Sequence, residues 1–308
     1  MRRALTLALA VAIDGVAGDP PTRLHPVGAL GSLARTFEAF APDGAGERSR
    51  YGRGVAAAFP LVAALAAWQF SARLGGSGPR RVAVDAGALS LSFALRTLLG
   101  RAGEIEAALR DHDLDGARTL LGTHLVSRDV RDLDASEVAA ATIESVAENL
   151  SDGVIAPWLW YAVGGLPAAW AYRAANTLDA MWGYHDERWI DLGAAAARTD
   201  DALNLVPARV TALALCAAAA IHGDGARAAR HWRDDAGETA SPNAGHPMAA
   251  MAGALGVRLA KPGEYVLGEG QRAPTHEDIG RACVLATEAA LIAGAALGAV
   301  LMGVGSRS

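Results

Sequence analysis

The chain contains one lysine, two cysteines and few aromatic residues. Lys261 is the only lysine among 308 residues, so nearly all positive charge comes from arginine. No dense basic block occurs, which argues against a nucleic-acid-binding protein. Cys216 and Cys283 stand alone in apolar segments, without partners at metal-ligand spacing. We therefore expect packing roles for both and no disulfide.

Two common phosphate-binding patterns are also missing. The single lysine is followed by Pro262, so no G-x-x-x-x-G-K-[ST] pattern exists and a P-loop is excluded. The G-x-G-x-x-G pattern of Rossmann nucleotide sites is absent as well. Any nucleotide chemistry must therefore use another arrangement of residues.

Alternating patterns typical of β-strands are scarce, whereas the chain has several long uncharged runs. Periodicity favours helices nearly everywhere. Three runs of at least 18 residues carry no charge, at 54–72, 153–172 and 289–306. Each is long enough for a transmembrane helix. Weaker candidates are 4–13, 82–95 and 203–221. A soluble alanine-rich helical protein is the alternative, but one soluble core would have to bury all three runs.

These observations predict an all-α, polytopic integral membrane protein with amphipathic and interfacial helices. No internal repeat or low-complexity linker divides the chain, so we expect a single domain over residues 1–308. A polar, amphipathic insertion stands out at about 101–137. It predicts two short helices broken near Asp115-Gly116.

The stretch 141–157 combines acids with the start of an uncharged run. Glu144, Glu148 and Asp152 recur every four residues, so a continuing helix would place them on one face. Like charges at this spacing repel unless a positive group lies between them. Acids at the mouth of an apolar segment therefore indicate a bound cation or a cationic substrate group. Asp152 has a second interpretation, because Ser151-Asp152-Gly153 is typical of a helix end.

Other polar clusters border the apolar segments. They are Asp19 with His25, Asn176 with Asp179, an alternation of acids and arginines from 187 to 209, and the turn-forming stretch around Asn243. Helix capping or a solvated face is the simpler interpretation of each one. Their number favours a shared polar site.

Carboxylates and arginines together suit a magnesium–phosphate site. Mg²⁺ takes one or two carboxylates and completes its shell with phosphate oxygens and water. Arginine grips phosphate or carboxylate in bidentate fashion. The arginines available for this are Arg23, Arg128, Arg188, Arg198 and Arg209.

These motifs, in this order, resemble the CbiB or CobD family of cobalamin-biosynthesis membrane proteins, the adenosylcobinamide-phosphate synthases. The resemblance rests on DGVAGDPPTRLHPVGALG, LVSRDV, ATIESVAENLSDGVIAP, AYRAANTLDAMWGY, ERWIDLGAAAARTDDALNLVPARVTAL and ASPNAGHPMAAMAGALGVRL. It extends from residue 14 to about 259. Leu150 and Val130 stand where the pattern leads us to expect threonine, and His246 where we expect an aromatic residue.

The resemblance implies an acid–amine (carbon–nitrogen) ligase. Such an enzyme joins adenosylcobyric acid to (R)-1-aminopropan-2-yl phosphate, or a similar aminoalcohol phosphate, through an amide bond. The reaction implies ATP as co-substrate and Mg²⁺. It also implies a multi-pass protein of the cell membrane with a cytoplasmic active site, and contacts with other late corrin-pathway membrane enzymes.

Roles follow from this resemblance for named residues. We expect Glu144, Glu148 and Asp179 to be catalytic, and the same three with Asp152 to bind metal. The residues expected to bind substrate or phosphate are Asp19, His25, Asn176, Arg188, Arg198, Arg209 and Asn243.

Two other functions stay open. One is a membrane signalling protein like AmpE, a distant relative to which the ligase reaction is not assigned. The other is a small-molecule transporter, in which intramembrane acids coordinate ions. The full set of acids and amides at 144–179 argues against the first, and the lack of inverted repeats against the second.

Overall fold

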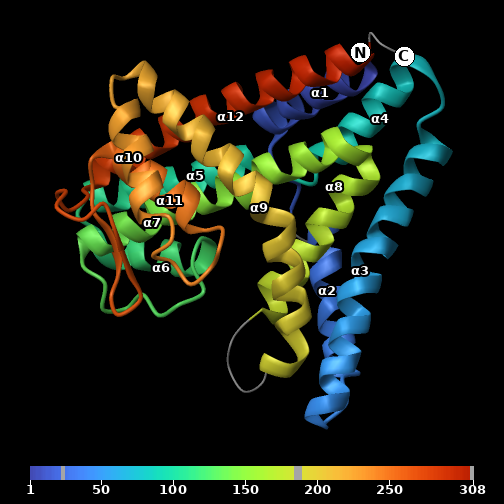
Figure 1. The fold of residues 1–308 in the computed structure, drawn as a ribbon, viewed down its shortest axis with the longest axis horizontal. Coiled ribbons are helices and arrows are strands. Elements are labelled where there is room, and N and C mark those ends of the chain that lie inside the picture. The colour runs from blue at the N-terminus through green and yellow to red at the C-terminus, as the bar shows by residue number, and fades with distance from the viewer. Residues whose placement is uncertain (22–24, 184–188, 306–308) are drawn as a thin grey trace. The chain divides into compact units, whose positions relative to one another are not determined.

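The structure is a computed structural model that describes residues 1–21, 25–183 and 189–305 (Figure 1). The helices, in chain order, are α1 (Arg2–Ala17), α2 (Pro26–Ala39), α3 (Ala45–Leu74), α4 (Gly78–Ser90), α5 (Leu95–Arg110), α6 (Leu114–His124), α7 (Ala135–Leu150), α8 (Ala156–Trp182), α9 (Ile190–Ile221), α10 (Gly225–Asp235), α11 (Gly245–Leu255) and α12 (His276–Gly305). A π-helical segment, η2 (Ser151–Ile155), joins α7 to α8.

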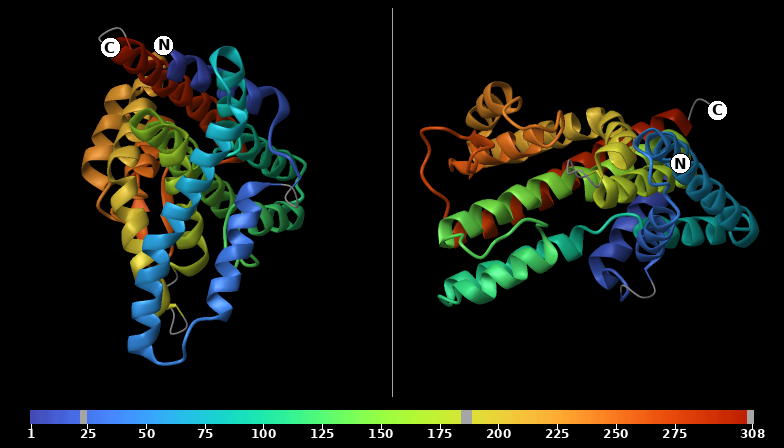
Figure 2. Two further views of the ribbon diagram at one scale, coloured as in Figure 1. Left: turned by 90° about the vertical axis from the view of Figure 1, so that its right-hand side faces the viewer. Right: turned by 90° about the horizontal axis from the view of Figure 1, so that it is seen from below.

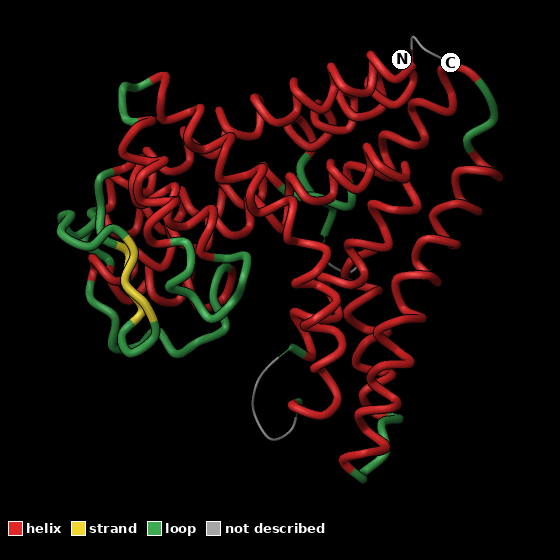
Figure 3. The backbone as a smooth tube through the Cα atoms, in the orientation of Figure 1, coloured by secondary structure: helices red, strands yellow, loops and turns green. Residues whose placement is uncertain are grey.

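The predicted all-α class is confirmed, with one small addition. Figure 3 shows helix along most of the described chain and a short pair of strands. These are β1 (Leu259–Lys261) and β2 (Tyr265–Leu267), which pair antiparallel with Lys261 opposite Tyr265. Three residues per strand are too few to give an alternating pattern, so the sequence did not predict this hairpin.

Within the described chain, four segments are long and apolar enough to cross a membrane. They are Ala45–Leu74, Gly78–Arg110, Ile190–Ile221 and His276–Gly303, the second of which is divided by a turn into α4 and α5. They contain the predicted run 54–72, most of 289–306, and the weaker candidates 82–95 and 203–221. The expectation of a polytopic helical membrane protein is thereby confirmed.

The run 153–172 was expected to form another spanning helix, and this expectation is wrong for the described structure. The run starts inside η2 and continues into α8, which is broken at Gly165, where φ is 71°. A positive φ is open to glycine without steric cost, and Pro167 follows directly. The uncharged run 153–172 therefore does not form one continuous straight helix.

The chain forms two compact units, each assembled from separate stretches of sequence. Unit 1 comprises residues 1–94, 156–204 and 296–308, and unit 2 comprises 95–155 and 205–295. The stretches that form the two units alternate along the chain. The single domain over residues 1–308 stays a prediction.

In unit 1, α3 packs along α8 (Figures 1 and 2). Phe59, Leu178 and Leu192 belong to the buried core between these helices and the start of α9. A side chain at Gly52 would overlap the backbone carbonyl of Leu192, and one at Gly193 would overlap that of Trp182. Glycine thus lets these helices meet backbone to backbone, as small residues do between membrane helices.

In unit 2, the middle of α7 is buried on all sides. Every residue from 138 to 147 is buried, and α5, α6, α11 and β1 all pack against this helix. Its start is fixed by a capping box. The Glu137 backbone N–H donates to Asp134 Oδ1 and the Asp134 N–H donates to Glu137 Oε2, both at 2.8 Å.

The polar insertion forms two short helices, as expected, but they are α5 and α6 and the break comes earlier. It lies at 111–113, where His112 has a φ of 61°. Asp113 caps α6 by accepting from the Gly116 N–H at 2.9 Å. Asp115-Gly116 therefore lies within the first turn of α6, because the side chain of Asp113 starts the helix two residues sooner.

Two glycines of α3 allow a test of the close helix packing. Gly52→Ala forces a methyl group onto the Leu192 carbonyl and should destabilise the protein by about 1–3 kcal/mol. Gly54→Ala is the matched control, since nothing lies within 4 Å of a Cβ there. It should be neutral or stabilising by up to about 1 kcal/mol. Thermal unfolding in detergent measures both, and equal effects would contradict the packing.

Candidate functional site

Glu144 is the most unusual carboxylate of unit 2. It lies in the middle of α7 and is only 5% exposed. Within the described chain, its Oε1 accepts no hydrogen bond. A buried carboxylate oxygen without a partner is costly, and such atoms call for a functional explanation. A cation or a ligand bound beside Glu144 would supply one.

Three side chains from other elements approach this carboxylate. Arg128, from the loop after α6, places Nη2 3.6 Å from Glu144 Oε2. The Tyr265 hydroxyl, from β2, lies against the carboxylate and stabilises its charged form, and the positive charge of Lys261 acts on it from β1. Glu148, one helical turn along α7, adds a like charge. The predicted neighbours Glu144 and Glu148 are thus brought together.

Burial dominates the protonation of Glu144. Removal from water raises the pKa of Glu144 to about 7, although Arg128, Tyr265 and Lys261 act in the opposite direction. Burial and the neighbouring Glu144 raise the pKa of Tyr265 well above its usual value, so this hydroxyl stays protonated. The site therefore holds a carboxylate that exchanges its proton near neutral pH.

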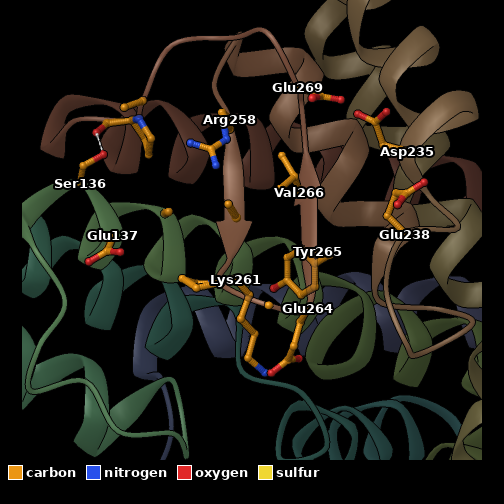
Figure 4. A pocket seen from close by; sticks show the side chains of 16 residues that line it. Ser136, Glu137, Asp235, Glu238, Arg258, Lys261, Glu264, Tyr265, Val266 and Glu269 are labelled. Carbon is orange, nitrogen blue, oxygen red and sulfur yellow. Dashed lines mark hydrogen bonds and ion pairs between the residues drawn. The ribbon is translucent and has the colours of Figure 1, made fainter.

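A cavity of about 670 Å³ adjoins this cluster (Figure 4). Its wall comes from the hairpin, the start of α7, the end of α10 and residues 269–274. Lys261, Glu264 and Tyr265 lie together on one side, while Asp235, Glu238 and Glu269 lie on another. Tyr265 therefore lines the cavity and contacts Glu144, and Lys261 lines the cavity from the paired strand.

The hairpin is held in place by α10. The Asp235 Oδ2 atom accepts from the Gly268 backbone N–H at 2.8 Å and from His231 Nδ1–H at 2.8 Å. Gly268 has a φ of 69°, and a side chain there would overlap the carbonyl of Val257. One carboxylate thus fixes the end of β2 against α10, which positions the wall of the cavity.

Asp152 is separated from the other two acids by a change of helix type. α7 ends at Leu150, and the chain continues without a break into η2, which contains Asp152. The wider π turn takes Asp152 out of the regular four-residue spacing. Single π turns inside helices are frequent at functional sites. The metal-binding role of Asp152 stays a prediction.

The predicted residues of unit 1 form a hydrogen-bonded network between α8 and α9. Asn176 Nδ2 donates to Asp200 Oδ1 at 3.2 Å, and Asn204 Nδ2 donates to Asp200 Oδ2 at 2.9 Å. Tyr172 donates to Asn204 Oδ1 at 2.8 Å, and Arg173 to Asn176 Oδ1 at 3.1 Å. Asn176 thus has protein partners on both sides of its amide, and its predicted substrate- or phosphate-binding role stays a prediction.

Asp179 lies one turn beyond Asn176 on α8, near the end of that helix. Its backbone carbonyl accepts from the Gly183 N–H at 2.6 Å, and its Oδ1 occupies the space where a side chain of residue 183 would lie. Its predicted catalytic role stays a prediction.

Two further pairs of predicted residues are in contact. His25 Nε2 lies 3.3 Å from Asp19 Oδ1 in unit 1, and His25 Nδ1 accepts from the Val27 N–H and so caps α2. Since Nδ1 is an acceptor, Nε2 carries the proton and donates to Asp19. In unit 2, Arg209 Nη1 donates to Asn243 Oδ1 at 3.3 Å.

Three predicted arginines remain, of which the structure describes one. Arg198 is exposed on α9. Arg188 and Arg23 lie outside the described residues. No group of three or more His, Cys, Asp or Glu side chains suited to a metal ion occurs in the described ranges. Mg²⁺ needs only one or two carboxylates from a protein, so Glu144 and Glu148 fit it without a third.

Sequence reasoning missed the hairpin side of this site. Lys261 and Tyr265 follow the last recognised motif, and nothing in their spacing points to Glu144. Composition was the one sequence feature that could have drawn attention to this hairpin. The single lysine of the chain lies in the turn-forming stretch K-P-G-E. Arg128 was recognised only as one of several arginines able to bind phosphate.

Comparison with known proteins identifies the family of the chain. The family model described as CobD/Cbib protein matches residues 7–291. The chain belongs to the CobD/Cbib family. The matched range contains every predicted site residue.

Curated relatives extend over most of the chain. A cobalamin biosynthesis protein CobD from Chromobacterium violaceum is 44% identical over 297 residues, covering 92% of this chain and 91% of that protein. CobD from Sinorhizobium sp. is 37% identical, with 89% and 91% coverage. A probable CobD from Methanothermobacter thermautotrophicus is 36% identical, with 87% and 88% coverage. No solved structure matches the chain.

The protonation of Glu144 has a consequence for stability. Its pKa is raised from 4.5 to about 7, so between these values the folded state binds the extra proton and stability falls as pH rises. Above pH 7 the full cost is about 3 kcal/mol. In metal-free buffer, Glu144→Gln should therefore be more stable than wild type by up to about 3 kcal/mol at pH 8 and similar to it at pH 4.5.

Chemical unfolding in detergent with a chelator measures this difference. Glu104→Gln is the control, because Glu104 forms an exposed ion pair with Arg101 on α5. Loss of a surface pair should change stability by less than about 1 kcal/mol at either pH. A Glu144→Gln protein that is less stable than wild type at pH 8 would contradict the buried, uncompensated carboxylate.

Proposed function

We propose that the protein is an adenosylcobinamide-phosphate synthase of cobalamin biosynthesis. It would join adenosylcobyric acid to (R)-1-aminopropan-2-yl phosphate, or a similar aminoalcohol phosphate, at the expense of ATP. Membership of the CobD/Cbib family and the names of its curated relatives support the pathway. The Glu144 cluster supports the ligase chemistry.

The observation that carries this proposal is the buried Glu144 carboxylate, which has one oxygen without a hydrogen bond in the described structure and Arg128 at 3.6 Å from the other. Glu144 and Glu148 supply carboxylate oxygens on one face of α7, and Arg128 and Lys261 supply positive charge beside them. This set of groups suits a phosphoryl transfer, which proteins catalyse mainly by positioning and by neutralising the charge on the transferring group. A bound Mg²⁺ would supply further neutralisation of phosphate oxygens.

Amide formation through an acyl phosphate needs two steps. A carboxylate oxygen of adenosylcobyric acid attacks the γ-phosphorus of ATP, and the bond to ADP breaks. The amine nitrogen of the aminoalcohol phosphate then attacks the acyl carbon, and inorganic phosphate leaves with the C–O electron pair. The ammonium form of this amine must first lose a proton. A carboxylate with a pKa of about 7, such as Glu144, is a suited acceptor at neutral pH.

The apolar segments support a membrane location for this reaction. We propose that the protein lies in the cell membrane, with its active site open to the cytoplasm, because ATP is a cytoplasmic substrate. The corrinoid, the aminoalcohol phosphate and the lipid bilayer are then its partners, together with other late corrin-pathway membrane enzymes.

Reconstitution tests the activity. Purified protein is incubated with adenosylcobyric acid, ATP, Mg²⁺ and each aminoalcohol phosphate, and corrin products are read by mass spectrometry. We expect a product whose mass is that of both substrates less one water. If no amine gives a product, the ligase assignment fails, and the AmpE-like signalling protein or the transporter takes its place.

Variants test the assignment of residues. Glu148→Ala and Asp179→Ala should lower the rate of amide formation by at least about a hundredfold, since each removes a group proposed for metal and phosphate. Membrane insertion should be unchanged. Arg131→Gln, at an exposed arginine paired with Asp129, is the control and should keep wild-type turnover. Wild-type rates in both acid variants would overturn these roles.

A further inference from the structure

Unit 1 contains a groove that the function proposed above does not use. Its volume is about 440 Å³, and its walls come from α3, α8 and the start of α9 (Figure 1). Cavities of about 300–1,000 Å³ hold small molecules in many proteins. All the residues that line this groove belong to unit 1, and among them Arg53 is charged and none is acidic. We call it the α3 groove.

The wall of the α3 groove is mainly apolar, because its other polar side chains are already paired inside unit 1. The Trp160 Nε1–H donates to the Leu203 carbonyl at 3.2 Å, and the Thr199 hydroxyl donates to the Ala195 carbonyl at 2.8 Å. The Tyr172 hydroxyl belongs to the network between α8 and α9 described above. Most of the remaining wall is alanine, leucine and proline, so the groove favours a hydrocarbon chain.

Arg53 is the exception in this wall. Its side chain is exposed, and within the described residues it makes no hydrogen bond or ion pair. A guanidinium carries five N–H donors in a planar arrangement that suits two oxygens of one phosphate. The α3 groove therefore combines one unpaired cation with an apolar wall.

Arg53 also lies where the charged part of α3 ends. The uncharged run 54–72 begins at the next residue, within a segment long and apolar enough to cross a membrane. Lipid phosphates lie at the edge of the hydrocarbon layer, and an arginine near the end of a spanning helix extends toward that edge. The position of Arg53 along α3 thus matches the level of the headgroups.

The α3 groove is continuous with an exposed apolar face of the same helix. Ala57 and Leu61 line the groove, and Leu61 is 69% exposed. Leu65 and Trp68 follow at spacings of four and three residues, so they continue this face, and both are exposed. Exposed apolar faces of this kind mark contact with lipid or with a partner. A lipid that lies along α3 can therefore reach the groove from this side.

We propose that the α3 groove binds an acyl chain of an anionic glycerophospholipid, with the phosphate of its headgroup on Arg53. Basic pockets between membrane helices bind lipid headgroups in this way. The apolar wall favours the acyl chain, and a single cation favours a headgroup that has no positive charge of its own. The inference goes beyond the proposed ligase activity, since it rests on the membrane-spanning segments and not on the reaction.

Native mass spectrometry tests the lipid class. Protein in a non-ionic detergent is titrated with dioleoylphosphatidylglycerol, and we expect saturable binding. Dioleoylglycerol lacks the phosphate and glycerophosphoglycerol lacks the acyl chains, so each should bind at least about tenfold more weakly. Dioleoylphosphatidylcholine should also bind more weakly, because its headgroup carries a cation. Equal binding of any of these three compounds, or no saturable binding of phosphatidylglycerol, would overturn the inference.

Two variants with matched controls test the place of binding. Arg53→Gln should weaken phosphatidylglycerol binding at least about tenfold. Arg50→Gln removes the same charge from an exposed position of α3 outside the groove and should change it less than about twofold. Ala57→Phe fills the groove from an exposed position and should also weaken binding, whereas Ala66→Phe, exposed on α3 outside the groove, should not. Equal affinities within either pair would contradict the site.

Photolabelling gives an independent measurement. A diazirine in an acyl chain of phosphatidylglycerol should label peptides of all three helices that form the groove, at 53–61, 168–172 and 195–203. Excess unlabelled phosphatidylglycerol should suppress this labelling. Labelling that is spread over the exposed apolar faces and resists suppression would indicate only bulk lipid around the protein, and would overturn the inference.

This proposal and the ligase assignment fail separately. Saturable phosphatidylglycerol binding without any amide product would leave the lipid site standing and remove the ligase assignment. Amide formation by a protein that binds no lipid saturably would leave the ligase standing and remove the lipid site.

Discussion

Burial of the Glu144 carboxylate is the constraint around which unit 2 is organised. α7 has no solvent-facing side between residues 138 and 147, so an acid in this part of the helix is largely removed from water. The protein brings partial compensation from three directions, through Arg128, Lys261 and Tyr265, and still leaves one oxygen unsatisfied. A chain selected for stability alone would be better served by an apolar residue here. The acid therefore indicates a task that an apolar residue cannot perform.

Features that depend on composition over long windows could be predicted from the sequence. Uncharged runs gave the all-α membrane class, and the motif order gave the family. The exception at 153–172 shows the limit of that reasoning. The absence of charge describes only the side chains of this run. The path of its backbone depends on the π-helical segment η2 and on the positive φ at Gly165. Both are local conformational choices that an average over 20 residues does not register.

The site was predictable only where its residues are neighbours on one helix. Glu144 and Glu148 follow from the four-residue spacing, and their closeness is local geometry. Tyr265 reaches Glu144, and Lys261 comes to the adjoining cavity, through tertiary packing of a hairpin too short to leave a periodic signal. Asn176 shows what spacing alone does not reveal. The sequence does not indicate that both ends of its amide have partners in the network between α8 and α9.

The glycine contacts of unit 1 also bear on how that unit opens and exchanges with solvent. Where Gly52 meets Leu192 and Gly193 meets Trp182, backbone touches backbone and no side chain lies between that could swing aside. Neither water nor lipid can reach these turns by a change of rotamer. Amide hydrogens there should exchange only when the helices separate, so that hydrogen exchange at 52 and 193 would report the cooperative opening of unit 1 and not local fraying.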